Sequence, residues 1–132
     1  MLTIPADLLS RFRVLLAEYG ELEFAVLVGS RASGHARPDS DWDIAIRWSR
    51  DVSAYQRLEW TESLRLDLAR LLKVEPEKID LIDLAVARLA MRALVAEHGQ
   101  VLYGAESLPW LRFLQTTWAQ LEDFDWRQRH AA

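Results

Sequence analysis

The sequence lacks cysteine, long apolar runs and an excess of basic residues. Without cysteine the chain can form neither disulfide bonds nor thiolate metal sites, which fits a reducing compartment. No apolar run approaches the ~20 residues of a transmembrane helix, and the first thirteen residues lack the basic and apolar segments of a signal peptide. These absences predict a cytoplasmic protein with no membrane partner.

The charge balance is slightly acidic, with a formal net charge of -4 at pH 7. Because no basic patch is interleaved with aromatic residues either, we expect no direct binding of nucleic acid. By contrast, 51% of the 132 residues are hydrophobic and six are Trp, which predicts a packed core. The length suits one domain, with a core at about residues 5–103 and a final helix at about residues 107–127.

The spacing of apolar residues predicts both helices and strands. Helices are expected over residues 5–19, 54–72, 86–98 and 107–127, and strands over residues 22–28, 41–48 and 78–84. Residues 100–103 fit either a short edge strand or a turn. The predicted fold class is α/β (α+β), with a three- to four-stranded mixed sheet, helices packed on one face and an extra C-terminal helix.

Several helix surfaces can also be predicted. The inner side of the helix over residues 54–72 should hold Tyr55, Leu58, Leu64, Leu68, Leu71 and Leu72. Arg88 and Arg92 are typical of a solvated helix face. The final helix carries apolar and aromatic side chains that either complete the core or form a helix-mediated interface: Leu111, Phe113, Leu114, Trp118, Leu121 and Phe124.

Residues 27–48, LVGSRASGHARPDSDWDIAIRW, combine a glycine turn with two closely spaced carboxylates. Asp41 and Asp43 lie one residue apart on a predicted strand, so both side chains point to the same face. The other face then receives the apolar side chains of Trp42, Ile44, Ile46 and Trp48. Upstream, Gly29 permits a sharp turn, and Ser30 offers a hydroxyl and an N–H at the start of a short helix. That geometry can cradle a phosphate group.

A third acidic residue follows on the predicted strand over residues 78–84. Asp80 and Asp83 are three residues apart, so only one of them can share a sheet face with the other acids. A carboxylate in an apolar strand is costly unless it faces a site or a partner charge. Three carboxylates from two strands can bind two magnesium ions in nucleotidyl transfer. The plainer alternative is a solvated pair on an edge strand, but such a pair needs no glycine turn behind it.

Gly29-Ser30, ten intervening residues, Asp41-x-Asp43 and the later Asp80 resemble the pattern of the nucleotidyltransferase superfamily with the polymerase-beta-like fold. The resemblance covers roughly residues 15–84, and the short chain points to the minimal (MNT) branch. That branch supplies the antitoxins of HEPN/MNT (type VII) toxin–antitoxin pairs. The resemblance implies nucleotide contacts for Gly29, Ser30, Arg31 and Ser40, and catalytic and magnesium-binding roles for Asp41, Asp43 and Asp80.

The function implied by the resemblance is transfer of AMP from ATP, with two magnesium ions, to a tyrosine hydroxyl of a cognate HEPN RNase toxin. Two alternatives remain open. The chain could neutralise its toxin by tight binding and occlusion with a vestigial site, or it could adenylylate a small molecule of the aminoglycoside type. Many relatives read Gly-Ser-x-Ala-Arg-Gly, whereas Ser33 stands here at the arginine position. The role of that arginine passes to Arg31 or Arg37, or is lost.

Overall fold

The computed structural model describes residues 4–131. Its elements follow in the order α1 (Ala6–Ala17), β1 (Leu22–Val28), α2 (Ser30–Ser33), β2 (Trp42–Trp48), α3 (Ala54–Leu72), a 3-10 turn (Pro76–Lys78), β3 (Ile79–Asp83), α4 (Leu89–His98), β4 (Gln100–Tyr103) and α5 (Leu108–Arg129). The predicted helices and strands are confirmed, with ends shifted by a few residues. The ambiguous segment over residues 100–103 is a strand, and the short helix expected after Gly29 is α2.

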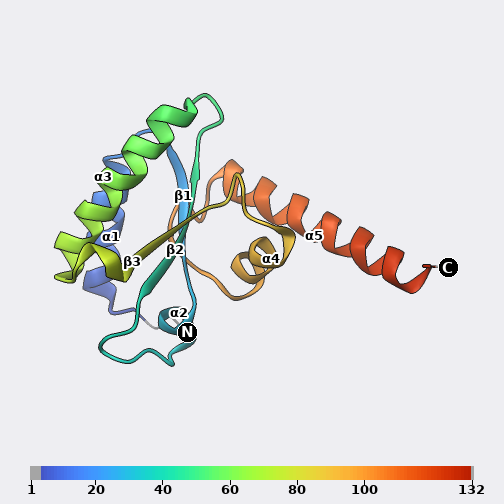
Figure 1. Ribbon diagram of the computed structural model, residues 1–132, viewed down its shortest axis with the longest axis horizontal. Coiled ribbons are helices and arrows are strands. Elements are labelled where there is room, and N and C mark those ends of the chain that lie inside the picture. Colours follow the sequence, from blue (N-terminus) through green and yellow to red (C-terminus); the bar gives the residue numbers. More distant parts are fainter. Residues whose placement is uncertain (1–3, 132) are drawn as a thin grey trace.

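The four strands form one mixed sheet in the order β3-β2-β1-β4 (Figure 1). β1 runs antiparallel to both β2 and β4, whereas β2 and β3 are parallel and are connected through α3. A register shift between Leu22 and Phe24 places Leu22 and Ala25 on one face although they are three residues apart. The two central strands, β1 and β2, are the most deeply buried.

Helices cover both faces of this sheet, so the prediction that they pack on one face is wrong. α1 and α3 lie on one side, and α4 with the first half of α5 lies on the other (Figure 1). The physical reason is visible in β1, whose side chains are apolar on both faces. Val26 and Val28 point towards α4 and α5, whereas Ala25 and Leu27 point towards α1.

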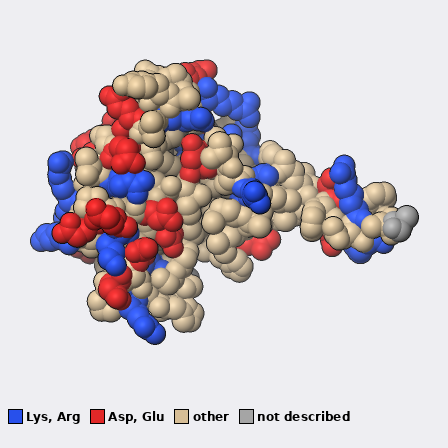
Figure 2. Space-filling model, in the orientation of Figure 1, with Lys and Arg blue, Asp and Glu red and all other residues tan. Residues whose placement is uncertain are grey.

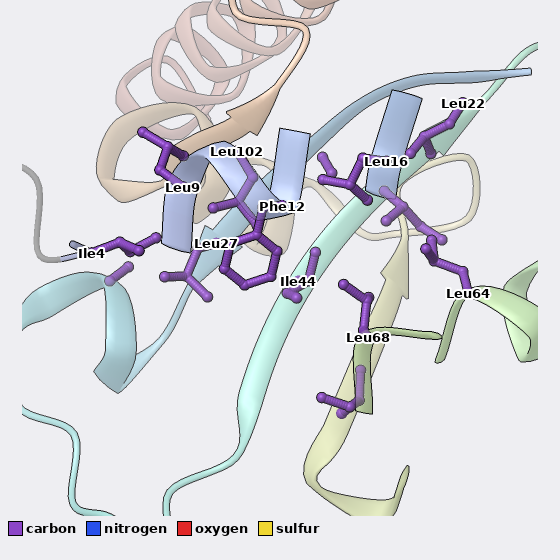
Figure 3. Close-up of a cluster of buried hydrophobic side chains, with 14 of the residues drawn as sticks. Ile4, Leu9, Phe12, Leu16, Leu22, Leu27, Ile44, Leu64, Leu68 and Leu102 are labelled. Carbon is purple, nitrogen blue, oxygen red and sulfur yellow. The ribbon is translucent and has the colours of Figure 1, made fainter. Parts of the chain in front are cut away.

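The larger core lies between α1, α3 and the sheet (Figure 3). Phe12 and Leu16 of α1 are fully buried against Leu27 and Ile44 of the central strands, and Leu68 closes the cluster from α3. Burying each of these side chains contributes about 1.5–3 kcal/mol relative to leaving it in water. This core fixes β1 and β2 side by side, which positions the loops at their ends.

The N-terminal part of α3 does not join that core. Ser53 caps the helix by accepting a hydrogen bond from the Gln56 backbone N–H at 3.2 Å. Tyr55 is 75% exposed and Leu58 is 66% exposed, so their predicted inward placement is wrong. Leu64 and Leu68 are buried as predicted. The first turns of α3 therefore extend beyond the sheet.

The smaller core lies on the other face, where Phe24 contacts Trp110 and Phe113 of α5 with ring centroids 5.1 and 5.5 Å apart. The second half of α5 extends away from the rest of the molecule (Figures 1 and 2). Trp118 is 46% exposed and Trp126 is 56% exposed. Within residues 4–131, no helix combines the length and apolar character needed to cross a membrane.

Candidate active site

Gly29, Asp43 and Asp80 meet at one end of the sheet. β1 ends at Val28, which pairs with Asp43 near the start of β2, and Asp43 pairs in turn with Asp80 near the start of β3. Neighbouring strands are about 4.8 Å apart, and residues in register direct their side chains to the same face. The two carboxylates are therefore neighbours, and the Gly29 turn lies on the other side of Asp43.

Asp41 completes the acidic group from just before β2. It lies two residues before Asp43 and is exposed, as is Asp80, whereas Asp43 is partly buried. The structure thus brings together the three predicted carboxylates. Asp83, on the opposite face of β3, instead lies 3.9 Å from Arg57 Nε through its Oδ2 and accepts a hydrogen bond from the Ala85 N–H at 2.9 Å. Of the two acids on β3, Asp80 is the one that belongs to the group.

Gly29 has a backbone conformation and a location that exclude a side chain. Its φ of 76° lies in the region that favours glycine, and a Cβ built there would overlap Asp43 Oδ2 and lie 3.3 Å from Asp43 Cγ. The turn therefore places the Gly29 backbone directly against the Asp43 carboxylate. Ser30 follows as the first residue of α2.

Burial and like charges together set the electrostatics of the group. Burial, then the negative charges of Asp80 and Asp41, raise the pKa of the Asp43 carboxyl above its usual range. Among residues 4–131, neither Asp43 nor Asp80 forms an ion pair. A cation bound here would relieve this repulsion. In the same range, however, no three or more His, Asp or Glu side chains are arranged to hold a metal ion.

Arg31 and Ser40 organise the loop between α2 and β2. The Arg31 guanidinium donates to the Ser40 carbonyl oxygen at 2.8 Å and to the Arg37 and Pro38 carbonyl oxygens at 3.3 Å, and it stacks over Trp42 at 4.2 Å. Ser40 Oγ accepts a hydrogen bond from the Arg37 N–H at 2.7 Å. These contacts shape the loop. The nucleotide contacts expected of Arg31 and Ser40 stay predictions.

Lys78 is a residue of this site that sequence reasoning missed. Its Nζ donates to the Asp39 carbonyl oxygen at 3.0 Å and lies 3.9 Å from Asp41 Oδ1. A signal was present in the predicted strand over residues 78–84, where Lys78 precedes Asp80 by two residues and would share its face; the structure places Lys78 at the end of the 3-10 turn. Gln100, whose Nε2 donates to the Ala32 carbonyl oxygen at 2.7 Å, supports the end of α2 and had no such signal.

Comparison with known proteins identifies the family of the chain. Residues 12–107 match the sequence profile of a protein family that is described as "polymerase beta, nucleotidyltransferase". The chain belongs to this nucleotidyltransferase family. The match begins in α1 and ends just before α5, so it includes Gly29 and all three carboxylates.

A curated protein is similar to the chain in sequence. It is the protein adenylyltransferase MntA of Aphanizomenon flos-aquae (strain 2012/KM1/D3), 30% identical over 92 residues. The alignment covers 67% of this chain and 61% of the length of MntA. The chain therefore matches less than two thirds of that relative.

Several solved structures share the fold of this chain. A chain in a crystal structure of a toxin–antitoxin MntA–HpeT mutant has a TM-score of 0.69 at 24% identity, covering 92% of this chain and 93% of that chain. A chain in a crystal structure of a toxin–antitoxin with AMP-PNP has a TM-score of 0.68 at 24% identity, covering 96% of this chain and 94% of that chain. A chain in the structure of the tri-AMPylated Shewanella oneidensis HEPN toxin in complex with MNT antitoxin has a TM-score of 0.63 at 24% identity. The match covers 93% of this chain and 92% of that chain. The predicted α/β fold with a mixed sheet is thereby confirmed, apart from the placement of the helices on one face.

Proposed function

We propose that this protein is an antitoxin nucleotidyltransferase that transfers AMP from ATP to a tyrosine hydroxyl of a cognate HEPN toxin. The observation that carries the proposal is the register of β1, β2 and β3, which sets Asp43 between the Gly29 turn and Asp80. Asp41 and Asp80 are exposed, so a side chain of another protein can reach them. The sequence similarity to MntA, a protein adenylyltransferase, supports a protein acceptor.

The donor set suits magnesium, although the three side chains are not arranged as a three-ligand cage. Magnesium prefers oxygen ligands and is usually bound by one or two carboxylates together with waters and substrate phosphates. Asp41 and Asp43 would hold it, with Asp80 beside them. Burial and the neighbouring carboxylates raise the pKa of Asp43, and a bound cation would offset both effects. When bound with ATP, magnesium would neutralise charge on the phosphates.

The reaction follows from the positions of these residues. The acceptor oxygen attacks the α-phosphorus of ATP, a phosphorus–oxygen bond forms, and the bond to the leaving pyrophosphate breaks. Asp80, exposed on β3, would take the proton released by the acceptor hydroxyl. Gly29 and Ser30 would bring backbone N–H groups close to the phosphates, since no Cβ at Gly29 blocks their approach.

The partner would be held by the projecting part of α5. Trp118, Phe124 and Trp126 are each about half exposed on this helix, and aromatic side chains are enriched at protein interfaces. A protein that uses ATP and binds a toxin acting on RNA would have to work in the cytoplasm. The same exposed helix favours the alternative function, in which the antitoxin neutralises the toxin by occlusion alone.

An isosteric pair of variants tests the catalytic proposal. Asp80→Asn and Asp83→Asn change the same strand by one charge each, but only Asp80 belongs to the acidic group. With α-labelled ATP, magnesium and the toxin encoded by the neighbouring gene, Asp80→Asn should lower label transfer by about 100-fold or more. Asp83→Asn should transfer label at nearly the wild-type rate.

Two results would contradict adenylyl transfer by this group. One is equal label transfer by wild type and Asp80→Asn. The other is no transfer by wild type under conditions in which the toxin is nevertheless neutralised, a result that would support occlusion.

A further inference from the structure

A second concave site lies at the opposite end of β2 from Asp43. It is a cavity of about 380 Å³ between the end of β2, the turn that follows, α4 and the first turns of α5. Arg47 lies four residues beyond Asp43 along β2, a separation of about 13 Å at ~3.3 Å per residue. The buried Ala45, which belongs to the same core cluster as Val95 of α4, lies between them. The cavity is therefore distinct from the acidic group.

Four arginines are among the residues that line this cavity: Arg47, Arg50, Arg92 and Arg112. The prediction that Arg92 lies on a solvated helix face is wrong, because it is partly buried and donates to the Ala87 carbonyl oxygen at 3.3 Å and to Gln120 Oε1. Within residues 4–131, the side chains of the other three arginines form no hydrogen bond or ion pair. In the view of Figure 2, basic side chains gather over the end of the sheet where β2 leads into α3.

The acidic residues of the lining do not neutralise these arginines. Glu23 and Asp51 are the two carboxylates present, and within residues 4–131 neither comes within 4 Å of an arginine nitrogen. Four cationic groups against two anionic ones leave an excess of positive charge. This excess stands out on a chain whose formal net charge is -4.

Thr117 adds an independent sign of a ligand. Its side chain lines the cavity and is fully buried, and its Oγ1 has no hydrogen-bond partner among residues 4–131. A buried hydroxyl without a partner is destabilising, and native structures rarely retain one without a reason. An acceptor atom bound in the cavity would satisfy it.

We propose that this cavity binds an oligophosphate, that is, the di- or triphosphate group of a small molecule. Arginine guanidinium groups match phosphate oxygens in charge and in their forked geometry, and four of them exceed what a single phosphate requires. The cavity has the volume of a small-molecule pocket. The proposal does not depend on adenylyl transfer.

Calorimetric titration of the full chain with pyrophosphate in magnesium-free buffer tests this site without turnover. Arg50→Gln/Arg112→Gln removes two charges from the cavity, whereas Arg127→Gln/Arg129→Gln removes two exposed charges of α5 outside it. The first variant should weaken pyrophosphate binding at least tenfold, and the second should leave it unchanged. Parallel titrations with ATP and with adenosine distinguish free pyrophosphate from a nucleotide triphosphate as the source of the phosphates.

Absence of pyrophosphate binding to wild type, or equal weakening in the two double variants, would overturn the proposal. Thr117→Val provides a separate readout, since it removes the buried hydroxyl at nearly constant volume. It should leave or raise the melting temperature of the free protein and weaken pyrophosphate binding. A lower melting temperature with unchanged pyrophosphate affinity would assign the hydroxyl a structural role and contradict this assignment.

Discussion

Gly29 and Gly20 offer a matched test of the turn that supports the acidic group. A Cβ at position 29 would overlap the Asp43 carboxylate at a φ of 76°, whereas a Cβ at position 20 would meet no atom within 4 Å. Gly29→Ala should therefore lower the free energy of unfolding by about 1–3 kcal/mol and abolish nucleotidyl transfer. Gly20→Ala should retain both, as measured by thermal melting and by label transfer. Equal activity of the two variants would show that the turn is not required.

Asp43 should be destabilising in the metal-free protein. Its pKa is raised by burial and by the charges of Asp80 and Asp41, so the folded state binds a proton at Asp43 more readily than the unfolded state does. The associated stability is present at acidic pH and is lost as pH rises through the folded pKa. Asp43→Asn should therefore melt at a higher temperature than wild type at neutral pH without magnesium, and this advantage should disappear in acid. A variant that melts lower at neutral pH would contradict the proposed repulsion.

The acidic residues were predictable because strand periodicity and spacing alone fix which side chains share a face. Asp41 and Asp43 follow from the period of two, and Asp80 required only that β3 pair beside β2 in that register. The contacts of Arg31 with three loop carbonyl oxygens were not predictable, because they depend on how eight residues of loop fold back on α2. Such contacts have no periodic signature in a sequence.

At the scale of elements, Tyr19 links the segment just after α1 to α3. Its hydroxyl donates to Asp67 Oδ2 at 2.5 Å, and burial, then this hydrogen bond, raise the pKa of Tyr19 to about 12. Tyr19→Phe should lower the free energy of unfolding by about 1 kcal/mol, whereas Tyr55→Phe, on an exposed ring, should have no effect.

The pH dependence of that difference has a defined sign. Because the folded pKa of Tyr19 exceeds the unfolded value of 10, its contribution is fully present below pH 10 and is lost as pH rises towards 12. Denaturant unfolding of wild type and Tyr19→Phe between pH 10 and 12 measures this contribution to the free energy of unfolding. A difference that does not shrink between pH 10 and 12 would contradict the role of the protonated hydroxyl.

The element order was predictable from apolar spacing, but the layering was misjudged. The helical periodicity shows that a helix has an apolar face and does not say which side of the sheet that face covers. The apolar run of β1 indicates the correct layering, because a strand that is buried on both faces requires helices on both faces of the sheet. Tyr55 and Leu58 were misplaced for a related reason, because helical spacing does not reveal where a helix passes the edge of its sheet.

At the scale of the whole molecule, the projecting half of α5 should be required for association with the toxin. Trp118→Ala/Trp126→Ala removes two exposed rings, so it should weaken toxin binding at least tenfold with little change in melting temperature. Trp110→Ala, which removes the ring packed on Phe24, should lower the melting temperature instead. Analytical ultracentrifugation of the mixed proteins measures the association, and undiminished binding by the double variant would place the interface elsewhere.

The central claim is that this nucleotidyltransferase modifies its partner rather than merely covering it. The most direct measurement is the intact mass of the toxin from the neighbouring gene after co-expression with wild type or with Asp41→Asn/Asp43→Asn. We predict an added mass of one or more AMP groups with wild type and none with the double variant. An unmodified toxin that still co-purifies with the wild-type protein in a tight complex would contradict the claim and establish neutralisation by binding.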